Sequence, residues 1–380
     1  MSEHHDICNL LVDLRDERFS ASAAARAHQA TERAGFTLER SIGATDQVLA
    51  WIDDEFGGSW SSEALAGSNI VATQGDQIAG FASYGASGLQ FSWLRGYGHH
   101  RDTGIFGPFG VTKGFRGSAL GPNLLVAALA ALREAGFTFA LIPCVSDARL
   151  IAYYIKHTGA HVIERFERAQ WHRHKYRTTV LASGNGSNFQ AVIDAVKDGR
   201  LPLHLENLAT NNPNAYALER ADITGVSGAV VAWDRATQTR VDYDARLLDA
   251  VARSEPELVL LLGWMHLLAM PFLERFPNVI NIHPAFLPLD QTSDVVGMRD
   301  GAQIPAFRGA RAITDALAHG SGWVGATAHL VTPDTDRGPV LMRKPLAVGS
   351  NATEPEIMAL LHPIEHRVLI GAIMRWVFER

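Results

Sequence analysis

Asn281 and His283 are the side chains best placed to do chemistry in this sequence. They end an apolar run that begins at Val279 and predicts a buried strand. Because side chains alternate along a strand, both point to one face, about 7 Å apart, at the end of the strand where open α/β sheets bind ligands. An amide donor and an imidazole placed there could hold an oxyanion and move a proton, as acyl transfer requires.

Residues 281–288, Asn-x-His-Pro-x-x-Leu-Pro, resemble the catalytic segment of the folate-dependent formyltransferases. Three further motifs, at 180–188, 260–265 and 329–339, resemble the same family in the same order along the chain. The resemblance runs from about Thr178 to the C-terminus and is nearest to the glycinamide ribonucleotide enzymes. It implies an α/β fold, with a Rossmann-like formyltransferase catalytic domain of mostly parallel strands over residues 176–380.

The resemblance also implies a role for individual residues. Asn281 and His283 would act with Asp336, whose carboxylate pairs with His283, positions water and raises the pKa of the imidazole. The implied folate contacts are Met265, Leu268 and Val331. The implied contacts to the acceptor and its phosphate are Gly184, Asn185, Gly186, Ser187, Asn188, His329 and Glu365.

Several of these roles have a structural alternative. The glycines, hydroxyl and amides of residues 183–188 suit an anion at a helix N-terminus, but they also suit a tight turn. A dinucleotide fingerprint is excluded there because Phe189 stands where a third glycine is required. Met265 and Leu268 lie at a spacing that is also typical of a helix core. Asp336 would also suit a turn before Gly338.

Hydrophobic patterning predicts the elements that carry these motifs. Residues 178–182 and 258–262 are expected as buried strands, and 189–197 and 354–378 as helices, with another helix opening at Gly263. Residues 289–304 are an expected insertion that forms a small hairpin about Asp300-Gly301. The chain then continues as Phe307-Arg308-Gly309, which resembles the methionyl-tRNA and sugar-nucleotide branches of the family. An insertion beside the site implies an altered acceptor pocket.

Residues 1–175 carry a different pattern. A hairpin at 69–84, a strand at 105–111, a glycine loop, a helix at 124–134, a strand at 137–144, a helix at 147–157 and a strand at 161–166 follow one another. This order resembles the GNAT acyltransferases and implies a GNAT-like α+β acyltransferase domain, in which backbone N–H groups hold the pyrophosphate of coenzyme A. The implied coenzyme A contacts are Arg116, Gly117, Ala119, Gly121 and Tyr154. A purely structural role for this domain stays open.

Composition limits the classes of partner. The net charge of −6 and the absence of a long basic run disfavour nucleic acid. Cys8 and Cys144 provide no disulfide framework, the N-terminus lacks a signal-peptide pattern, and the most apolar window, 258–273, is too short for a membrane span, so a cytoplasmic location is expected. No carboxylate or cysteine spacing supports a metal site at His99-His100 or at His172 and His174.

The sequence therefore predicts an N-formyltransferase. It would move a formyl group from N10-formyltetrahydrofolate to the primary amine of a small, phosphate-bearing acceptor, such as an amino sugar nucleotide or an amino-acid-derived metabolite. Glycinamide ribonucleotide as the acceptor, a mainly coenzyme-A-dependent N-acyltransferase, and a bifunctional enzyme that also uses acetyl-CoA are the alternatives. Assembly as a homo-oligomer stays open.

Overall fold

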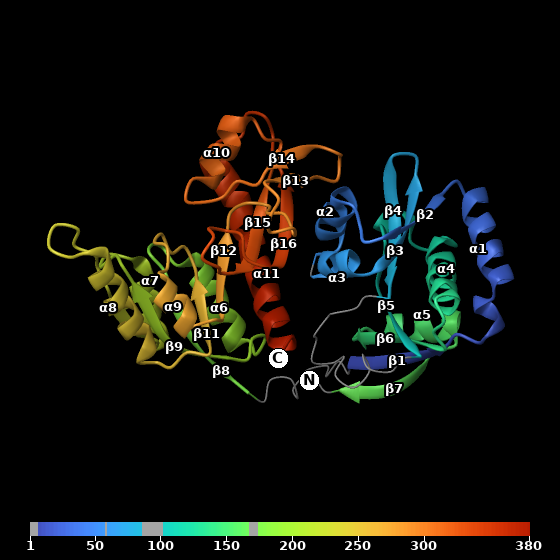
Figure 1. Cartoon of the computed structure of the whole chain (residues 1–380), viewed down its shortest axis with the longest axis horizontal. Helices are drawn as coiled ribbons and strands as arrows, with labels where there is room; N and C mark the ends of the chain where they lie inside the picture. Colours follow the sequence, from blue (N-terminus) through green and yellow to red (C-terminus); the bar gives the residue numbers. More distant parts are fainter. Residues whose placement is uncertain (1–6, 58, 86–101, 167–173) are drawn as a thin grey trace. The chain divides into compact units, whose positions relative to one another are not determined.

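The structure is a computed structural model that describes residues 7–57, 59–85, 102–166 and 174–380. The chain divides into two compact units (Figure 1). Unit 1 comprises Met1–Trp171 with Phe378–Arg380, and unit 2 comprises His172–Val377. The expected boundary between residues 175 and 176 lies close to this division.

Unit 1 is built on a seven-stranded sheet in the order β2-β3-β4-β5-β6-β1-β7. The strands are β1 (Ile7–Asp13), β2 (Thr37–Ile42), β3 (Ser68–Gln74), β4 (Gln77–Tyr84), β5 (Thr103–Val111), β6 (Phe139–Val145) and β7 (His161–Phe166). The helices are α1 (Ala21–Arg33), α2 (Asp46–Glu55), α3 (Trp60–Ala66), α4 (Leu120–Glu134) and α5 (Ala148–Thr158). The β3–β4 hairpin, β5, α4, β6, α5 and β7 confirm the elements predicted for residues 69–166, with shifted ends.

Long-range pairing sets the rest of the unit 1 sheet. The N-terminal strand β1 lies between β6 and β7 and pairs antiparallel with both. Strands β5 and β6 are parallel, but they are paired only from Thr103 to Ile105 on β5, so they separate beyond that point. Among the described residues, the separation leaves one side of the later part of β5 without a strand neighbour, next to the start of α4.

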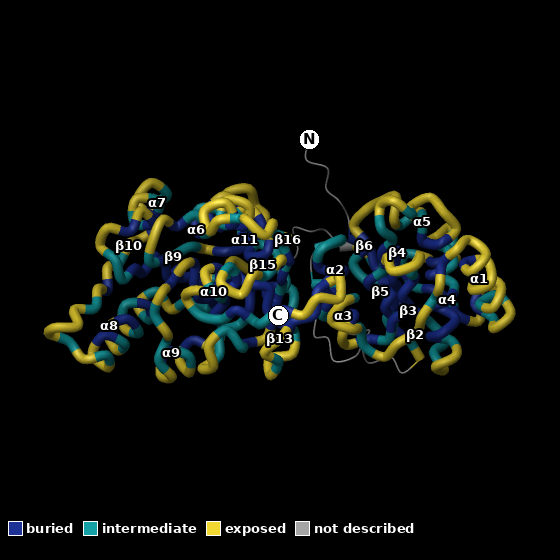
Figure 2. Tube along the Cα trace, turned by 90° about the horizontal axis from the view of Figure 1, so that it is seen from above, coloured by how far each residue is buried: buried dark blue, intermediate teal, exposed yellow. Residues whose placement is uncertain are grey.

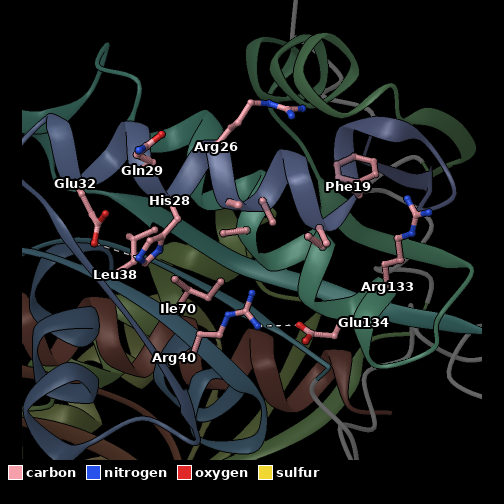
Figure 3. Close-up of a pocket in the computed structure, with 15 residues that line it drawn as sticks. Phe19, Arg26, His28, Gln29, Glu32, Leu38, Arg40, Ile70, Arg133 and Glu134 are labelled. Carbon is pink, nitrogen blue, oxygen red and sulfur yellow. Dashed lines mark hydrogen bonds and ion pairs between the residues drawn. The ribbon is translucent and has the colours of Figure 1, made fainter.

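A hollow of about 1030 Å³ lies in unit 1 between α1, α4, β2 and β3 (Figure 3). Its rim carries two ion pairs, Arg40 with Glu134 at 3.0 Å and His28 with Glu32 at 3.4 Å. None of the predicted site residues lines it. We therefore assign no chemistry to this hollow.

Unit 2 is built on a second seven-stranded sheet in the order β10-β9-β8-β11-β12-β15-β16. Its strands are β8 (Tyr176–Leu181), β9 (Leu203–Thr210), β10 (Ser227–Val230), β11 (Leu258–Leu261), β12 (Val279–His283), β15 (Trp323–Leu330) and β16 (Val340–Ala347). The helices are α6 (Ser187–Lys197), α7 (Tyr216–Thr224), α8 (Arg240–Ala252), α9 (Met270–Arg275), α10 (Ala312–His319) and α11 (Glu354–Phe378). The first four pairings in this order are parallel and the last two, β12 with β15 and β15 with β16, are antiparallel, which confirms the expected mostly parallel sheet.

Buried strands form the centre of unit 2, as Figure 2 shows in dark blue. The β11 segment Leu-Val-Leu-Leu is buried at all of its positions, as a strand covered on both faces must be. On one face, α8 and α9 pack through Tyr243, Leu247 and Phe272 against Leu181 and Val259. Since the strands are locked by this packing, their carboxyl ends are fixed positions from which loops can present side chains.

Helix α11 has the length and apolar composition of a membrane span, with 25 residues. Its side chains at Leu361, Val368 and Leu369 are fully buried in the protein, and it also buries the carboxyl group of Glu365. A buried ionisable group and a packed apolar side indicate the core helix of a folded unit, and we assign α11 to the core of unit 2.

The helix predicted to open at Gly263 is wrong. Gly263 has a φ of +76°, a left-handed conformation that ends the regular strand without starting a right-handed helix. The following loop is held by two hydrogen bonds, from Ser183 N to the Gly263 carbonyl at 3.1 Å and from Met265 N to Ser183 Oγ at 3.2 Å. The helix, α9, begins only at Met270.

The hairpin predicted within residues 289–304 is confirmed. Strand β13 (Val295–Gly297) pairs antiparallel with β14 (Gln303–Pro305). Its turn contains Gly301 at a φ of +82°, as a tight turn demands. The tip is fixed because the Trp323 indole N–H donates to Asp300 Oδ2 at 2.8 Å.

Gly338 is predicted to be the position in the loop after β15 least tolerant of substitution. A Cβ there would lie 1.6 Å from the backbone oxygen of Leu330, and backbone cannot swing aside as a side chain can. Gly338→Ala should lower the free energy of unfolding by about 3 kcal/mol or more, as measured by urea denaturation. Gly349→Ala, where a Cβ would meet nothing within 4 Å, is the matched control. Equal stability of the two variants would contradict this packing.

Candidate active site

Asn281 and His283 lie on β12 and face the neighbouring strand β15. The antiparallel register places Asn281 opposite His329 and His283 opposite Thr327, so the four side chains share one face of the sheet. Asn281 Nδ2 lies 3.2 Å from His329 Nε2. Thr327 has a separate task, because its Oγ1 donates to the Ala285 carbonyl at 2.7 Å and accepts from Leu287 N at 3.0 Å. It thereby holds the chain that leaves His283.

Asp336 reaches the same place from the loop between β15 and β16. It has a φ of +52°, which is unusual for a residue other than glycine. Its Oδ1 lies 3.4 Å from Asn281 Nδ2 and 3.4 Å from His329 Nε2, and its Oδ2 lies 3.6 Å from His283 Nδ1. Asn281, His283 and Asp336 therefore meet as the sequence predicted, and His329 joins them.

The segment from Phe307 to Gly309 closes the cluster from another side. His283 Nε2 lies 2.8 Å from the Phe307 carbonyl oxygen, and the Gly309 backbone N–H donates to Asp336 Oδ2 at 2.7 Å. A carbonyl can only accept, so the neutral His283 ring carries its proton on Nε2. The unprotonated Nδ1 is consequently the atom that faces the Asp336 carboxylate.

Burial and charge act in opposite directions on this pair. Burial of the His283 imidazole lowers its pKa below the ordinary value, although Asp336 and the Phe307 carbonyl raise it. The expected raising effect of Asp336 is present, but the expected net rise is wrong because desolvation is stronger. Burial alone would raise the pKa of Asp336, yet contacts with His329, His283 and the Gly309 N–H hold it well below its usual range. The protein at neutral pH thus presents a neutral imidazole beside a carboxylate.

Residues 183–186 lie in the loop between β8 and α6, and Ser187 and Asn188 are the first residues of α6. Gly186 caps α6 with a φ of +75°, and a Cβ there would lie 2.9 Å from Cβ of Ala217, so glycine is required. No side chain caps the helix, and the first backbone N–H groups of a helix have no partner within it. Arg220 donates to the Asn185 carbonyl at 2.9 Å and to Asn185 Oδ1 at 3.0 Å. The backbone N–H groups at the start of α6, with the Arg220 side chain nearby, are suited to bind an anion.

Glu365 of α11 faces the same loop. Asn188 Nδ2 donates to Glu365 Oε2 at 3.4 Å, and the carboxyl group is only 4% exposed. Burial raises the pKa of Glu365, and the hydrogen bond from Asn188 lowers it. Burial has the larger effect, so the pKa is raised to about 7. The group changes charge near neutral pH, next to the predicted phosphate contacts.

The raised pKa of Glu365 predicts a loss of stability as pH rises. The folded protein holds this proton up to about pH 7, whereas the unfolded chain releases it near the ordinary value, so stability falls between these two pH values. Glu365→Gln should remove this loss, which is on the order of 3 kcal/mol. Urea denaturation of both proteins at pH 5 and pH 8 measures it, with the exposed Glu219→Gln as control. A parallel pH dependence in all three proteins would contradict the assignment.

The predicted folate contacts surround a different part of unit 2. Met265 lies in the loop after β11 and is 59% exposed, while Leu268 and Val331 pack against the core beneath α8 and α9. Val331 N also bonds to the Val279 carbonyl at 2.8 Å, which ties its loop to β12. These positions offer an apolar surface, and their role remains a prediction.

The predicted coenzyme A contacts of unit 1 are only partly brought together. Arg116 Nε donates to the Val111 carbonyl at 2.9 Å, Gly117 has a φ of +83°, and Ala119 caps α4 just before Gly121. Tyr154, expected at the reacting thiol, lies in the hydrophobic core instead, where burial raises its pKa. Its neighbour Tyr153 is the tyrosine whose hydroxyl lies against Gly121, 2.7 Å from where a Cβ would stand.

Metal ligation has no support in the described ranges, where no three histidine, cysteine, aspartate or glutamate side chains gather in a metal-binding group. His174 instead lies 2.8 Å from Glu257. His99, His100 and His172 lie outside the described residues.

Comparison with known proteins identifies the family. A family model described as "Formyl transferase" matches residues 176–294 and 301–373. The phosphoribosylglycinamide formyltransferase of Escherichia coli is 30% identical over 190 residues, which cover 50% of this chain and 81% of that protein. The chain belongs to the formyl transferase family. It is therefore an enzyme of formyl transfer, and Asn281, His283 and Asp336 lie within the matched residues.

Two further proteins are similar to this chain. The phosphoribosylglycinamide formyltransferase of Mycobacterium tuberculosis is 32% identical over 200 residues, which cover 52% of this chain and 83% of that protein. The crystal structure of glycinamide ribonucleotide transformylase 1 from Symbiobacterium toebii is 33% identical, with a TM-score of 0.46, and the match covers 53% of this chain and 87% of that chain.

The match to the formyl transferase family also gives the insertion fewer residues than the sequence predicted. The family model is interrupted only at residues 295–300, whereas the sequence predicted an insertion of 289–304. The interruption contains strand β13 and the start of the turn that follows it. Residues 289–294 and strand β14 therefore belong to the matched segments, and β13 with the start of its turn is what departs from the family model.

Several groups of the active site could not be predicted from the sequence. The Phe307 carbonyl and the Gly309 N–H are backbone groups, for which a sequence carries no signal. Asp294 and Arg337 are ordinary charged residues in loops, and only the fold shows that they bond to each other. Arg308 was expected only as part of a segment that resembles the methionyl-tRNA and sugar-nucleotide branches, and the structure shows it bonded to Asp294 and to the backbone of Asp336.

Proposed function

We propose that unit 2 transfers the formyl group of N10-formyltetrahydrofolate to the primary amine of a small, phosphate-bearing acceptor. The observation that carries the proposal is the meeting of Asn281, His283 and Asp336 within hydrogen-bonding or ion-pairing distance, in a chain that belongs to the formyl transferase family. The apolar surface of Met265, Leu268 and Val331 fits a flat folate ring. Bound there, the folate supplies a formyl carbon open to attack by an amine.

The residues of the cluster divide the work of transfer. A new bond forms between the acceptor nitrogen and the formyl carbon, and the bond from that carbon to N10 breaks. Asn281 Nδ2 donates to the oxygen that gains negative charge in between. His283 takes the proton of the attacking amine on Nδ1 and returns it to N10 as that nitrogen leaves, so that no proton is gained or lost overall.

Asp336 stabilises the transient imidazolium form of His283 in this buried site. Protonation at Nδ1 converts the contact between a lone pair and a carboxylate at 3.6 Å into an ion pair. The Phe307 carbonyl keeps the opposite nitrogen, Nε2, as the permanent donor and fixes the ring direction. The cluster is thus arranged so that charge on His283 is favoured only when the reaction generates it.

The acceptor is proposed to carry a phosphate because the first turn of α6, after the loop at 183–186, offers the backbone N–H groups and the Ser187 hydroxyl that an anion requires. Glycinamide ribonucleotide fits the names of the relatives, and an amino sugar nucleotide or an amino-acid-derived amine fits the interruption of the family match at 295–300 and the Phe307-Arg308-Gly309 segment that follows. The test is a set of amines assayed in pairs, with and without the phosphate. The proposal expects a much lower KM for the phosphorylated member of the preferred pair, and Ser187→Ala should remove most of that difference. Equal KM values within every pair would contradict the phosphate assignment.

For unit 1 we propose a GNAT-like fold that binds acetyl-CoA or a related thioester. The specific support is the separation of β5 from β6 beyond Ile105, with the glycine loop and the start of α4 beside it. Tyr153 replaces Tyr154 as the tyrosine near this position. Calorimetric titration with acetyl-CoA and, separately, with a stable folate analogue tests both units, and heat with the folate analogue alone would leave unit 1 without a ligand.

We also propose a cytoplasmic enzyme that acts on a small molecule rather than on nucleic acid. The net charge of −6 and the sequence pI near 6.2 argue against a polyanionic partner.

A further inference from the structure

Three consecutive residues, Phe307, Arg308 and Gly309, each hold one part of the active cluster. Phe307 fixes the His283 ring through its carbonyl, and Gly309 fixes the Asp336 carboxylate through its N–H. Between them, Arg308 Nε donates to the Asp336 backbone carbonyl at 3.2 Å. Arg308 does not touch the reacting position, but it holds the residue that does.

The backbone of Asp336 needs such support. A side-chain-bearing residue at a φ of +52° lies in the left-handed region, which costs roughly 1–2 kcal/mol. Contacts on both the carbonyl and the carboxylate keep this conformation in place of a relaxed one that would turn the carboxylate away from His283. Arg308 supplies the first of these contacts and Gly309 the second.

Arg308 is itself anchored by Ser293 and Asp294, the last residues before strand β13 of the hairpin. Its Nη1 donates to Asp294 Oδ1 at 2.9 Å and its Nη2 to the Ser293 carbonyl at 2.8 Å. All three nitrogens of the guanidinium are therefore engaged. A lysine would keep the charge but could not reproduce this planar, three-way fork.

Asp294 also pairs with the residue that follows Asp336. Arg337 bonds to Asp294 Oδ1 and donates to the Gln291 carbonyl at 3.0 Å. The hairpin is fixed at its base because Ala306 N donates to the Asp294 carbonyl at 2.9 Å, and at its tip by the bond between Trp323 and Asp300. A chain of contacts thus runs from the hairpin through Asp294 to both sides of the Asp336 loop.

We infer that Arg308 is a positioning residue for formyl transfer, and that the hairpin acts through Asp294 and Arg308 to hold the Asp336 carboxylate toward His283. The inference rests on the proposed function, because it gives Asp336 a place in that reaction. It assigns the hairpin a catalytic purpose rather than only a role in shaping the acceptor pocket.

The decisive variant is Arg308→Lys, which preserves the charge. The groups facing His283 are Asp336, which raises its pKa, and His329 and Arg308, which lower it, together with the Phe307 carbonyl. Lysine keeps the positive charge at position 308. A change in the His283 pKa in Arg308→Lys would therefore report that Asp336 has moved. Loss of the fork should let Asp336 turn away, so the His283 pKa should fall further. In Arg308→Gln the loss of the positive charge would by itself raise the His283 pKa. If Arg308 acted only through its charge, the His283 pKa would therefore rise in Arg308→Gln and stay unchanged in Arg308→Lys.

The experiment combines histidine titration by NMR with steady-state kinetics on the full chain. Arg308→Lys and Asp294→Ala should lower kcat by about 10- to 100-fold, as a small displacement of a catalytic group does, with KM for formyltetrahydrofolate within about twofold. Asp294 is 73% exposed, so its replacement leaves the fold intact. Arg311→Gln, at a side chain 79% exposed and only three residues from Arg308, is the matched control and should behave as wild type.

Two results would overturn the inference. The first is wild-type kcat in both Arg308→Lys and Asp294→Ala, and the second is an unchanged His283 titration in Arg308→Lys. The NMR measurement needs no turnover, so it gives its answer even if the wild-type protein formylates none of the amines tested. That failure would count against the proposed function alone.

Discussion

Replacing His283 by alanine is expected to lower kcat for formyl transfer by about 10²–10⁴-fold, the usual contribution of a positioned acid–base group. The Phe307 carbonyl holds the Nε2 proton of the His283 ring, so the lone pair on Nδ1 faces the Asp336 carboxylate at 3.6 Å. Without it, the amine proton has no acceptor and N10 has no donor. Steady-state rates with formyltetrahydrofolate and the preferred amine measure the effect.

The fold should survive this substitution, which makes the rate informative. His283 bonds to a backbone carbonyl but does not hold a core element, since β12 is paired on both sides by β11 and β15. His204→Ala, which removes an exposed imidazole bonded to Glu206 on β9, is the matched control and should keep full activity. A His283 variant with near-normal kcat would remove the proton-transfer role.

Asp336→Asn is expected to have a second large effect, on both rate and pH dependence. In the wild type the acid limb of kcat/KM should lie below about pH 6.5, because burial lowers the pKa of His283 from that ordinary value. Asparagine keeps the size of the side chain and can still accept from the Gly309 N–H, but it removes the charge that raises the His283 pKa. The acid limb should therefore move to still lower pH, while kcat falls by about 10²-fold or more.

The pH profile separates this account from a structural role for Asp336. A carboxylate that only held a turn would lower activity through stability and leave the acid limb where it is. Asp334→Asn, an exposed carboxylate two residues earlier in the same loop, is the matched control and should change neither kcat nor the limb. An acid limb that moved upward in Asp336→Asn would show that the negative charge does not act on His283.

The reacting residues could be predicted from the sequence, whereas most of the groups that surround them could not. The alternation of Asn281 and His283 along a strand could be predicted because it depends only on strand geometry. The family resemblance then supplied Asp336 from a distant motif. The net lowering of the His283 pKa could not be predicted, because it depends on how deeply the ring is buried, which no local pattern records. The same is true of the Phe307 carbonyl, which any residue at that position would offer.

The fold shows the same division between local and long-range information. The β3–β4 hairpin, the buried strand β11 and the hairpin of β13 and β14 have local signals in turn residues and apolar runs, and the structure contains all of them. The placement of β1 between β6 and β7 has no local signal, because it joins segments separated by most of unit 1. The helix expected at Gly263 failed because two hydrogen bonds with Ser183 outweigh the helical spacing of Trp264, Met265 and Leu268.

The most direct test of the central claim follows one carbon atom. Formyltetrahydrofolate labelled with carbon-13 at the formyl group is incubated with the enzyme and a set of phosphorylated and unphosphorylated amines, and the products are weighed by mass spectrometry. The account predicts that an acceptor gains one labelled formyl unit at its amine, and that Asn281→Ala, His283→Ala and Asp336→Asn each slow this gain severely while remaining folded. Label that stays on the folate or leaves as free formate with every amine, or equal transfer by the wild type and the three variants, would contradict it.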